Sequence, residues 1–330
     1  MRAIIVPHYG PPEVVETRDV PSPVVGPKHV LVRVFATTVT SGDWRVRSGK
    51  FPRGFGWIAT LAIGMRGPRN AILGTEVSGI VEAVGSQVTG FKVGDAVFGF
   101  TGASMGGHAE LCRFLETDGL LMPKPTNLTF EEAASISFGG TTAIDVLRRA
   151  KLKAGDRILI VGAAGGVGSS LVQLAKHIGA HVTGVCSASN VDFVRSLGAD
   201  RVLDYANEDF TKDDARYDVI VDTAGTAPYA RSKVVLKDGG RLGLVLATLG
   251  DNLGALTVGL FTRHKVLAGP VMVRADHMRE LAQLAMTGAV KPVIGGRFEF
   301  EKIVEAHRLV ETGHKRGSVV VSLDARATDR

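Results

Sequence analysis

The stretch from Ile158 to Gly168, ILIVGAAGGVG, has the residue types and spacing of a phosphate-binding turn. An apolar run, a glycine-rich bend and a helix-like segment follow one another within about 30 residues, the order of a dinucleotide-binding βαβ unit. Gly165 would let the backbone approach a diphosphate, and Gly168 would let helix and strand pack closely. An ordinary strand-to-helix turn is the less favoured alternative. The predicted cofactor-binding residues here are Gly162, Ala163, Ala164, Gly165, Gly166, Val167 and Gly168.

The end of the next apolar run, residues 181–186, should decide which dinucleotide binds. An NAD site usually places an acid there, about 20 residues past the glycines. Here Ser187, Ser189 and Asn190 occupy the position, and the first acid is Asp192. Small hydroxyl side chains accept a 2′-phosphate without repulsion, so the sequence predicts NADP(H). The alternative is that the serines merely begin the following helix, and no Arg or Lys nearby offers a counter-charge.

Composition bounds the class of protein. A chain of 330 residues suggests about two domains. Hydrophobic residues make up 45% and charged residues 22%, typical of a globular protein, and the net charge of +6 is scattered, which disfavours nucleic-acid binding. Cys112 and Cys186 cannot build a disulfide framework, which predicts a reducing, cytoplasmic setting. No run approaches the ~20 apolar residues of a membrane span, so none is expected.

Two kinds of element must position the predicted site. Residues 1–124 form short β-rich runs broken by turns, which predicts a barrel or sandwich, with residues 51–71 as a glycine-rich loop. Thr129 is a plausible helix N-cap, followed by Glu131 and Glu132. From residue 157, apolar strands alternate with helices, which predicts a doubly wound parallel sheet. The last apolar run, GSVVVSL, is expected to return to the first unit.

Several motifs together resemble the medium-chain dehydrogenase/reductase superfamily, in its zinc-free quinone oxidoreductase branch. They include VTSGDWRVRSG, LGTEVSGIVEAVGSQVTGFKVGDAVFGF, GAAGGVG, SLGADRVLDY and YDVIVDTAG. The resemblance implies a GroES-like β-barrel catalytic domain interrupted by a Rossmann domain, with the active site between them and a homodimer as the assembly. It places the catalytic domain at 1–124, the Rossmann domain at 125–265, and a returning C-terminal segment at 266–330.

The resemblance also bears on metal binding. Zinc-dependent members would place Cys, His and Cys or an acid where this chain has Thr40, Thr75 and Ser137. A catalytic zinc needs about three Cys, His or carboxylate ligands, and neutral hydroxyls are poor substitutes. Glu76 and Asp43 alone make an unconvincing site. No metal is therefore expected, and Cys112 is expected in the core.

Catalysis without a metal favours reduction of an activated acceptor, a quinone or an α,β-unsaturated carbonyl, over simple alcohol oxidation. The hydroxyls of Thr40 and Thr142 are candidate hydrogen-bond donors to the acceptor, with solvent completing protonation. Asp43 is expected to anchor its turn, although a proton-donating role is the alternative. Trp44 either stacks on the substrate or nicotinamide or is buried under the 51–71 loop.

Further residues are assigned mainly by resemblance. Thr142, at the predicted start of a helix, would also contact the nicotinamide side, or serve as a cap. Tyr205 would lie by the adenosine, Lys315 would approach the cofactor phosphate with Arg316 beside it, and Thr223 and Ala224 complete the cofactor set. The pair Arg45 and Arg47 is expected on a solvated strand edge, with recognition of an acidic acceptor as the alternative.

The sequence thus predicts an NADPH-dependent, zinc-independent oxidoreductase that transfers a hydride to a quinone or α,β-unsaturated carbonyl. One alternative is an NADP-dependent aldehyde or ketone reductase, similar to an alcohol dehydrogenase. Another is a low-turnover NADPH-binding sensor or accessory protein.

Overall fold

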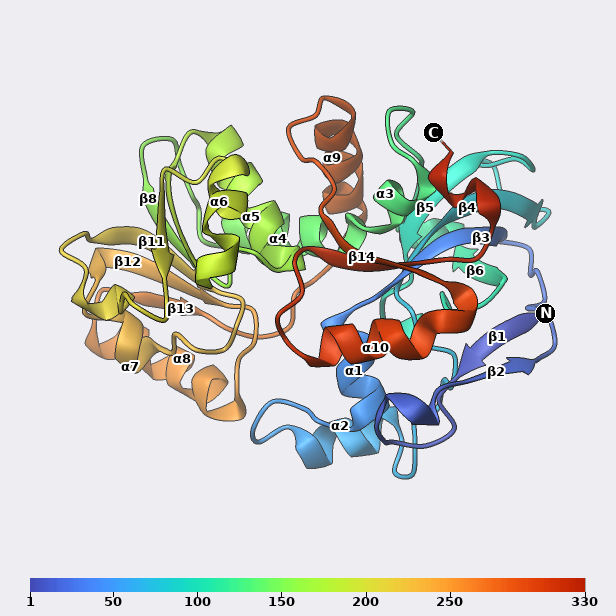
Figure 1. The fold of residues 1–330 in the computed structure, drawn as a ribbon, viewed down its shortest axis with the longest axis horizontal. Helices are drawn as coiled ribbons and strands as arrows, with labels where there is room; N and C mark the ends of the chain where they lie inside the picture. The colour runs from blue at the N-terminus through green and yellow to red at the C-terminus, as the bar shows by residue number, and fades with distance from the viewer. Residues whose placement is uncertain (330) are drawn as a thin grey trace.

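The computed structural model describes residues 1–329, which form two lobes (Figure 1). Both termini lie on the lobe built around a seven-stranded sheet of order β14-β15-β3-β4-β5-β7, with β6 paired to β3. Its strands are β3 (His29–Val39), β4 (Glu76–Val84), β5 (Ala96–Phe100), β6 (Leu111–Leu115), β7 (Leu121–Pro123), β14 (Ile294–Glu299) and β15 (Ser318–Ser322). Strands β1 (Arg2–Ile5) and β2 (Glu16–Asp19) pair separately. As expected, β15 returns to the first unit and pairs with β3.

The other lobe is a six-stranded sheet of order β10-β9-β8-β11-β12-β13, in which the paired strands run parallel. Its strands are β8 (Arg157–Val161), β9 (His181–Cys186), β10 (Arg201–Asp204), β11 (Tyr217–Asp222), β12 (Leu236–Leu244) and β13 (Lys265–Leu267). Along β8, Ile158 and Ile160 join one hydrophobic cluster, whereas Leu159 and Val161 join another. Because alternate side chains of a strand point to opposite faces, both faces of this sheet are covered.

Helices cover the two faces of the six-stranded sheet. Those of this lobe are α4 (Ser137–Arg149), α5 (Gly166–Ile178), α6 (Val191–Ser196), α7 (Tyr229–Ser232) and α8 (Leu249–Phe261). Figure 1 shows α4, α5 and α6 on one side of the sheet and α7 and α8 on the other. This arrangement confirms the prediction of a doubly wound parallel sheet.

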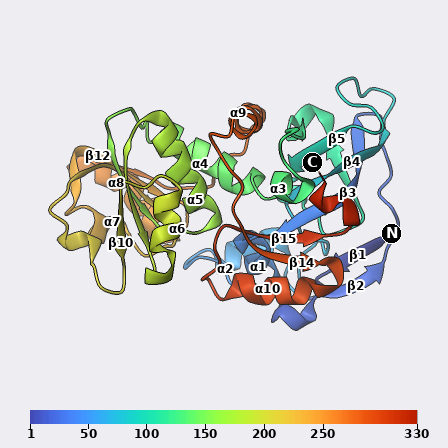
Figure 2. The same cartoon turned by 45° about the horizontal axis from the view of Figure 1, so that its top comes forward.

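The remaining helices are α1 (Ser41–Ser48), α2 (Gly56–Ile63), α3 (Phe130–Ala134), α9 (Ala275–Met286) and α10 (Ile303–Glu311). Figure 2 shows α3 and α4 passing between the two lobes. Thr129 caps α3 as predicted, because its side chain accepts from the Glu132 N–H while the Glu132 carboxylate accepts from the Thr129 N–H. Helix α9 packs on α4 and contributes Met278 and Leu281 to their shared core.

Three local expectations were wrong. Residues 51–71 contain α2 rather than only a loop. Arg47 lies on helix α1, and its side chain is fully buried, so it is not on a solvated strand edge. Helix α4 begins at Ser137, so Thr142 lies inside the helix and not at its start. Among residues 1–329, no helix has the length and apolar character needed to cross a bilayer.

Candidate active site

A cavity of about 690 Å³ lies where the two lobes meet. One wall is formed by the carboxyl ends of β8, β9 and β11, which is where open parallel sheets bind ligands. The other wall comes from the β3–α1 junction, the start of β4 and residues 313–318. The predicted site residues that line it are Thr40, Gly162, Ala164, Gly165, Gly166, Val167, Ser187, Asn190, Tyr205, Thr223, Ala224 and Lys315.

The glycine turn fits a diphosphate. Gly162 has a φ of +82°, and a Cβ there would lie 2.5 Å from the Thr223 hydroxyl. A Cβ on Gly168 would lie 2.1 Å from the Gly162 carbonyl oxygen, so this glycine lets helix and strand approach. A Cβ on Gly165 would meet nothing closer than 3.5 Å, so the turn leaves room over the N–H groups at the start of α5. Ala163 and Gly168 pack this turn from behind and do not line the cavity.

The end of β9 carries a positive charge that local sequence did not reveal. The Asn190 amide donates to the Ser187 hydroxyl at 3.0 Å, and the Ser187 and Ser189 hydroxyls lie 3.2 Å apart. Arg316 reaches this group from the C-terminal segment, donating to the Ser189 carbonyl at 2.5 Å and to the Asn190 side chain. Its guanidinium also lies over the Phe193 ring, 5.7 Å from the centroid. Arg316 therefore supplies the counter-charge whose absence weakened the NADP(H) prediction.

At the opposite end of the cavity, Thr40 caps helix α1. Its hydroxyl donates to the Asp43 carboxylate at 2.6 Å, and Asp43 also accepts from the backbone N–H of Thr40 and from that of Gly74. Asp43 is fully buried and does not line the cavity, so it holds the turn that presents Thr40.

Trp44 and Thr142, like Asp43, were predicted as catalytic residues but do not line the cavity. Trp44 packs into the hydrophobic cluster that also contains Ile63, the last residue of α2. Thr142 is fully buried within α4, and its hydroxyl has no hydrogen-bond partner. Phe138 and Gly139, in the first turn of the same helix, line the cavity instead. Ser189, predicted to contact the cofactor, also falls outside the cavity lining.

Glu76 is the acidic residue that sequence reasoning weighed only as a metal ligand. It lines the cavity with a side chain that is almost fully buried, and it accepts from the Phe138 N–H at 2.6 Å and from the Thr38 hydroxyl. Burial raises the pKa of Glu76 to about 7. Lys315 lines the same cavity, and burial lowers its pKa to about 8, while the charge of Glu76 acts to raise it.

The residues at the positions of zinc ligands do not fit a catalytic zinc. The hydroxyls of Thr75 and Ser137 are buried without a hydrogen-bond partner, and Thr40 bonds to Asp43. Within residues 1–329, no cluster of three or more His, Cys, Asp or Glu side chains is placed to hold a metal ion. Cys112 is buried in a hydrophobic cluster of the barrel, as predicted.

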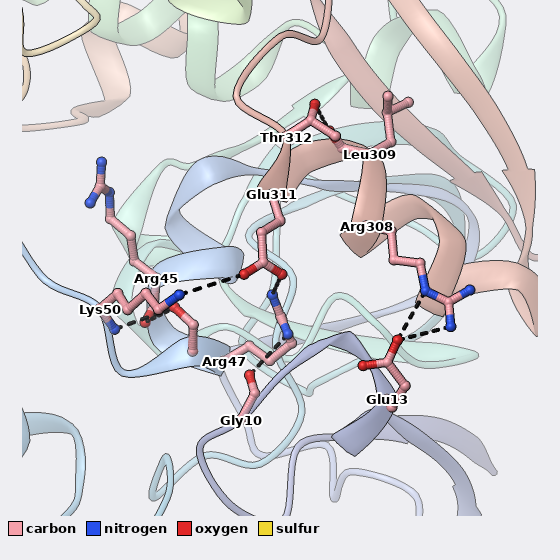
Figure 3. A network of polar contacts seen from close by, with 10 residues as sticks. Gly10, Glu13, Arg45, Arg47, Lys50, Arg308, Leu309, Glu311 and Thr312 are labelled. Atoms are coloured by element: carbon pink, nitrogen blue, oxygen red, sulfur yellow. Dashed lines mark hydrogen bonds and ion pairs between the residues drawn. The ribbon is translucent and has the colours of Figure 1, made fainter.

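A buried ion pair supports the cavity wall at residues 313–315 (Figure 3). The Arg47 guanidinium donates to the Glu311 carboxylate at 2.7 Å and to the Gly10 carbonyl at 2.9 Å. Figure 3 shows the contact joining α1 to the last residue of α10. A second pair, Arg308 with Glu13 at 2.9 Å, ties α10 to the N-terminal region. These contacts fix the end of α10, from which the chain continues directly into the cavity lining.

A doubly wound sheet with a glycine turn, closed by a barrel lobe across a cavity, defines a two-domain, nucleotide-dependent oxidoreductase. Comparison with known proteins identifies the family. Residues 26–188 match the alcohol dehydrogenase GroES-like domain, and residues 197–321 match a family described as zinc-binding dehydrogenase. The chain belongs to the medium-chain dehydrogenase/reductase superfamily, in its quinone oxidoreductase-like branch, which confirms the resemblance.

Similar proteins extend over nearly the whole chain. The 2-methylene-furan-3-one reductase of Solanum lycopersicum is 34% identical, covering 97% of this chain and 79% of that protein. The NADPH-dependent alkenal/one oxidoreductase of Arabidopsis thaliana, a chloroplastic protein, is 32% identical with the same coverage. The quinone oxidoreductase of Coxiella burnetii has a solved structure that superposes with a TM-score of 0.87 at 28% identity, covering 98% of this chain and 99% of that one.

Proposed function

We propose that this chain is an NADPH-dependent oxidoreductase that delivers a hydride to a quinone or an α,β-unsaturated carbonyl without zinc. The observation that carries the proposal is the cavity between the lobes, because its two ends differ in chemistry. One end combines the glycine turn with Ser187 and Asn190, and the Arg316 guanidinium bonds to the Asn190 side chain. The other end combines Thr40, Glu76 and Phe138. The NADP(H) prediction agrees with the name of the Arabidopsis relative.

The bound cofactor would supply the hydride, and the chain would orient it. The turn from Gly162 to Val167 would hold the diphosphate, while Arg316 would neutralise a 2′-phosphate near Ser187. In this orientation the nicotinamide would face the barrel lobe. There the Thr40 hydroxyl stays hydrogen-bonded to Asp43, so its oxygen is held at a fixed position on the cavity wall. Apolar neighbours such as Val39 and Phe138 would limit water around the acceptor.

Steady NADPH oxidation with a panel of quinones and enones tests the proposal. Turnover with aldehydes or ketones alone would favour the alcohol dehydrogenase-like alternative, and tight NADPH binding without turnover would favour a sensor. Tighter binding of NADH than of NADPH would contradict the cofactor assignment. Loss of activity on dialysis against a chelator, with recovery on adding zinc, would contradict the zinc-free assignment.

We also propose the assembly, the location and the domain limits. Helix α8 has no buried residue, and Leu256, Leu260 and Phe261 are 74%, 77% and 84% exposed beside the edge strand β13. A homodimer would cover this apolar surface, and light scattering of wild type against Leu260→Lys would test it. A cytoplasmic setting remains our proposal, as do the limits 1–124, 125–265 and 266–330.

A further inference from the structure

Two titratable side chains with shifted pKa values, Glu76 and Lys315, line the cavity in which the acceptor would be reduced. Glu76 begins β4 and is 2% exposed, whereas Lys315 lies half-buried on the segment before β15. Both line the cavity, and each carries a charge that acts on the other. The Lys315 ammonium donates to the Gly317 carbonyl at 2.5 Å, which leaves it with donors unused by that contact.

The surroundings bring the pKa values of both side chains near neutral pH. Burial, the larger effect, raises the pKa of Glu76 to about 7, opposed by its two hydrogen bonds, and nearby Asp43 adds to the increase. His108 contacts Thr38, the residue whose hydroxyl donates to Glu76, with its ring nitrogen 2.9 Å from the Thr38 carbonyl oxygen. On the other side, burial lowers the pKa of Lys315 to about 8. Groups with pKa values near the working pH can both give and regain protons, which an ordinary surface lysine does poorly.

The neighbouring residues Lys315 and Arg316 have different surroundings, because Lys315 lines the cavity whereas Arg316 does not. Arg316 contacts Ser189 and Asn190 at the end of β9, whereas Lys315 interacts electrostatically with Glu76 of the barrel lobe. Arg316 is thus already placed to meet a 2′-phosphate. A phosphate-binding role does not account for a lysine that shares the cavity lining with a buried carboxyl and is influenced by its charge.

We propose that Lys315 and Glu76 together deliver the proton that completes reduction of the acceptor, an inference that rests on the proposed function. Hydride addition to the β-carbon of an enone moves an electron pair onto the carbonyl oxygen and leaves an enolate. An N–H bond of the Lys315 ammonium breaks, its electron pair stays on nitrogen, and the proton bonds to the enolate. A water molecule in the cavity passes a proton from the Glu76 carboxyl to the Lys315 nitrogen, and Glu76 is reprotonated from solvent. Each turnover thus consumes one proton from solvent.

The first test measures Lys315 directly in the cofactor-free protein. The rate of amine acylation at Lys315, followed by mass spectrometry against pH, should give a midpoint near 8, below the value of about 10.4 that is typical of a free lysine side chain. Acylation of the exposed Lys233 serves as a control for the reagent. Removing the negative charge in Glu76→Gln should lower the Lys315 midpoint further, because Glu76 acts to raise it. A Lys315 midpoint near about 10.4 would overturn the proposal.

The second test compares variants during turnover. Lys315→Met should lower kcat about 100-fold at neutral pH, as expected for loss of a general acid, with little change in NADPH affinity. Lys315→Arg should not restore kcat, because a guanidinium keeps its proton at every working pH. Lys233→Met, the control, should behave as wild type. Rescue by arginine, or a loss confined to NADPH affinity, would show that Lys315 only contacts the cofactor.

The two tests separate this inference from the proposed function. If the wild-type enzyme reduces quinones or enones and Lys315→Met has the same kcat, the proton-delivery step alone is contradicted. Wild-type protein that reduces no acceptor would contradict the proposed function, and the acylation midpoints would still decide whether Lys315 and Glu76 form a coupled pair. Lys315 is only half-buried, so its variants are expected to fold. They therefore still test the proposal if Glu76→Gln does not fold.

Discussion

The ion pair between Arg47 and Glu311 should respond asymmetrically to loss of either partner. The Arg47 side chain is fully buried, whereas that of Glu311 is 29% exposed. Replacing Glu311 with Met leaves a guanidinium inside the protein with only the Gly10 carbonyl as partner. Replacing Arg47 with Met leaves a carboxylate that already reaches water and lies 3.8 Å from the exposed Lys50 ammonium.

The structure sets the size of each effect. An unpaired buried charge typically destabilises by about 3–5 kcal/mol, so Glu311→Met should lower the free energy of unfolding by that amount. Arg47→Met loses hydrogen bonds to a carboxylate that water can partly replace, and about 1–2 kcal/mol is expected. The double variant removes the buried guanidinium together with its carboxylate partner, so no unpaired charge is left inside the protein. It should therefore be close to Arg47→Met alone and more stable than Glu311→Met.

Urea unfolding of the four proteins measures these differences, with m-values checked for a common transition. Arg308→Met is a matched control, because its partner Glu13 and the arginine itself are both more than half exposed, and little change is expected. If Arg47→Met proved as destabilising as Glu311→Met, or the double variant were the least stable, the argument from unequal burial would be refuted.

Three further predictions concern the cavity. Arg316→Ala should weaken NADPH binding by about 10-fold or more and leave NADH binding nearly unchanged, measured by titration of cofactor fluorescence. Gly168→Ala should abolish NADPH binding because its Cβ would lie 2.1 Å from the Gly162 carbonyl, whereas Gly254→Ala, with open space around its Cβ, should be neutral or stabilising in thermal unfolding. Glu76 takes up protons more readily in the folded state, so wild-type stability should fall relative to Glu76→Gln as pH rises from 4.5 to about 7.

Local sequence patterns predicted the parts of the site that one continuous segment builds. The apolar run and glycines at 158–168 require no distant residue to form their turn, and the structure shows that turn at the end of β8. The capping pattern at Thr129 was also readable. The same pattern occurs at Thr40 and Asp43, where a helix follows, yet polar residues such as Arg45 and Arg47 suggested an exposed strand edge.

Residues brought together by tertiary contacts were not predictable in the same way. Arg316 lies 126 residues from Asn190 in sequence, so a search around β9 could not find the counter-charge. From sequence, Glu76 was considered only as part of an incomplete metal site. Its burial could not be predicted, because it depends on α4, whose Phe138 N–H donates to the Glu76 carboxylate. Thr142 was placed at a helix start from sequence, but α4 begins five residues earlier and buries it.

The C-terminal segment couples the two halves of the proposed chemistry. The Gly317 N–H donates to the Ala164 carbonyl at 2.9 Å, and Gly317 forms an isolated bridge with Gly165 of the glycine turn. The same segment places Lys315 in the cavity lining and directs Arg316 to the end of β9, so both positions depend on the segment staying fixed. Gly317, with a φ of +49°, would place a Cβ 2.1 Å from the Val293 carbonyl. A side chain there would displace the segment, and cofactor affinity and proton delivery should then be lost together.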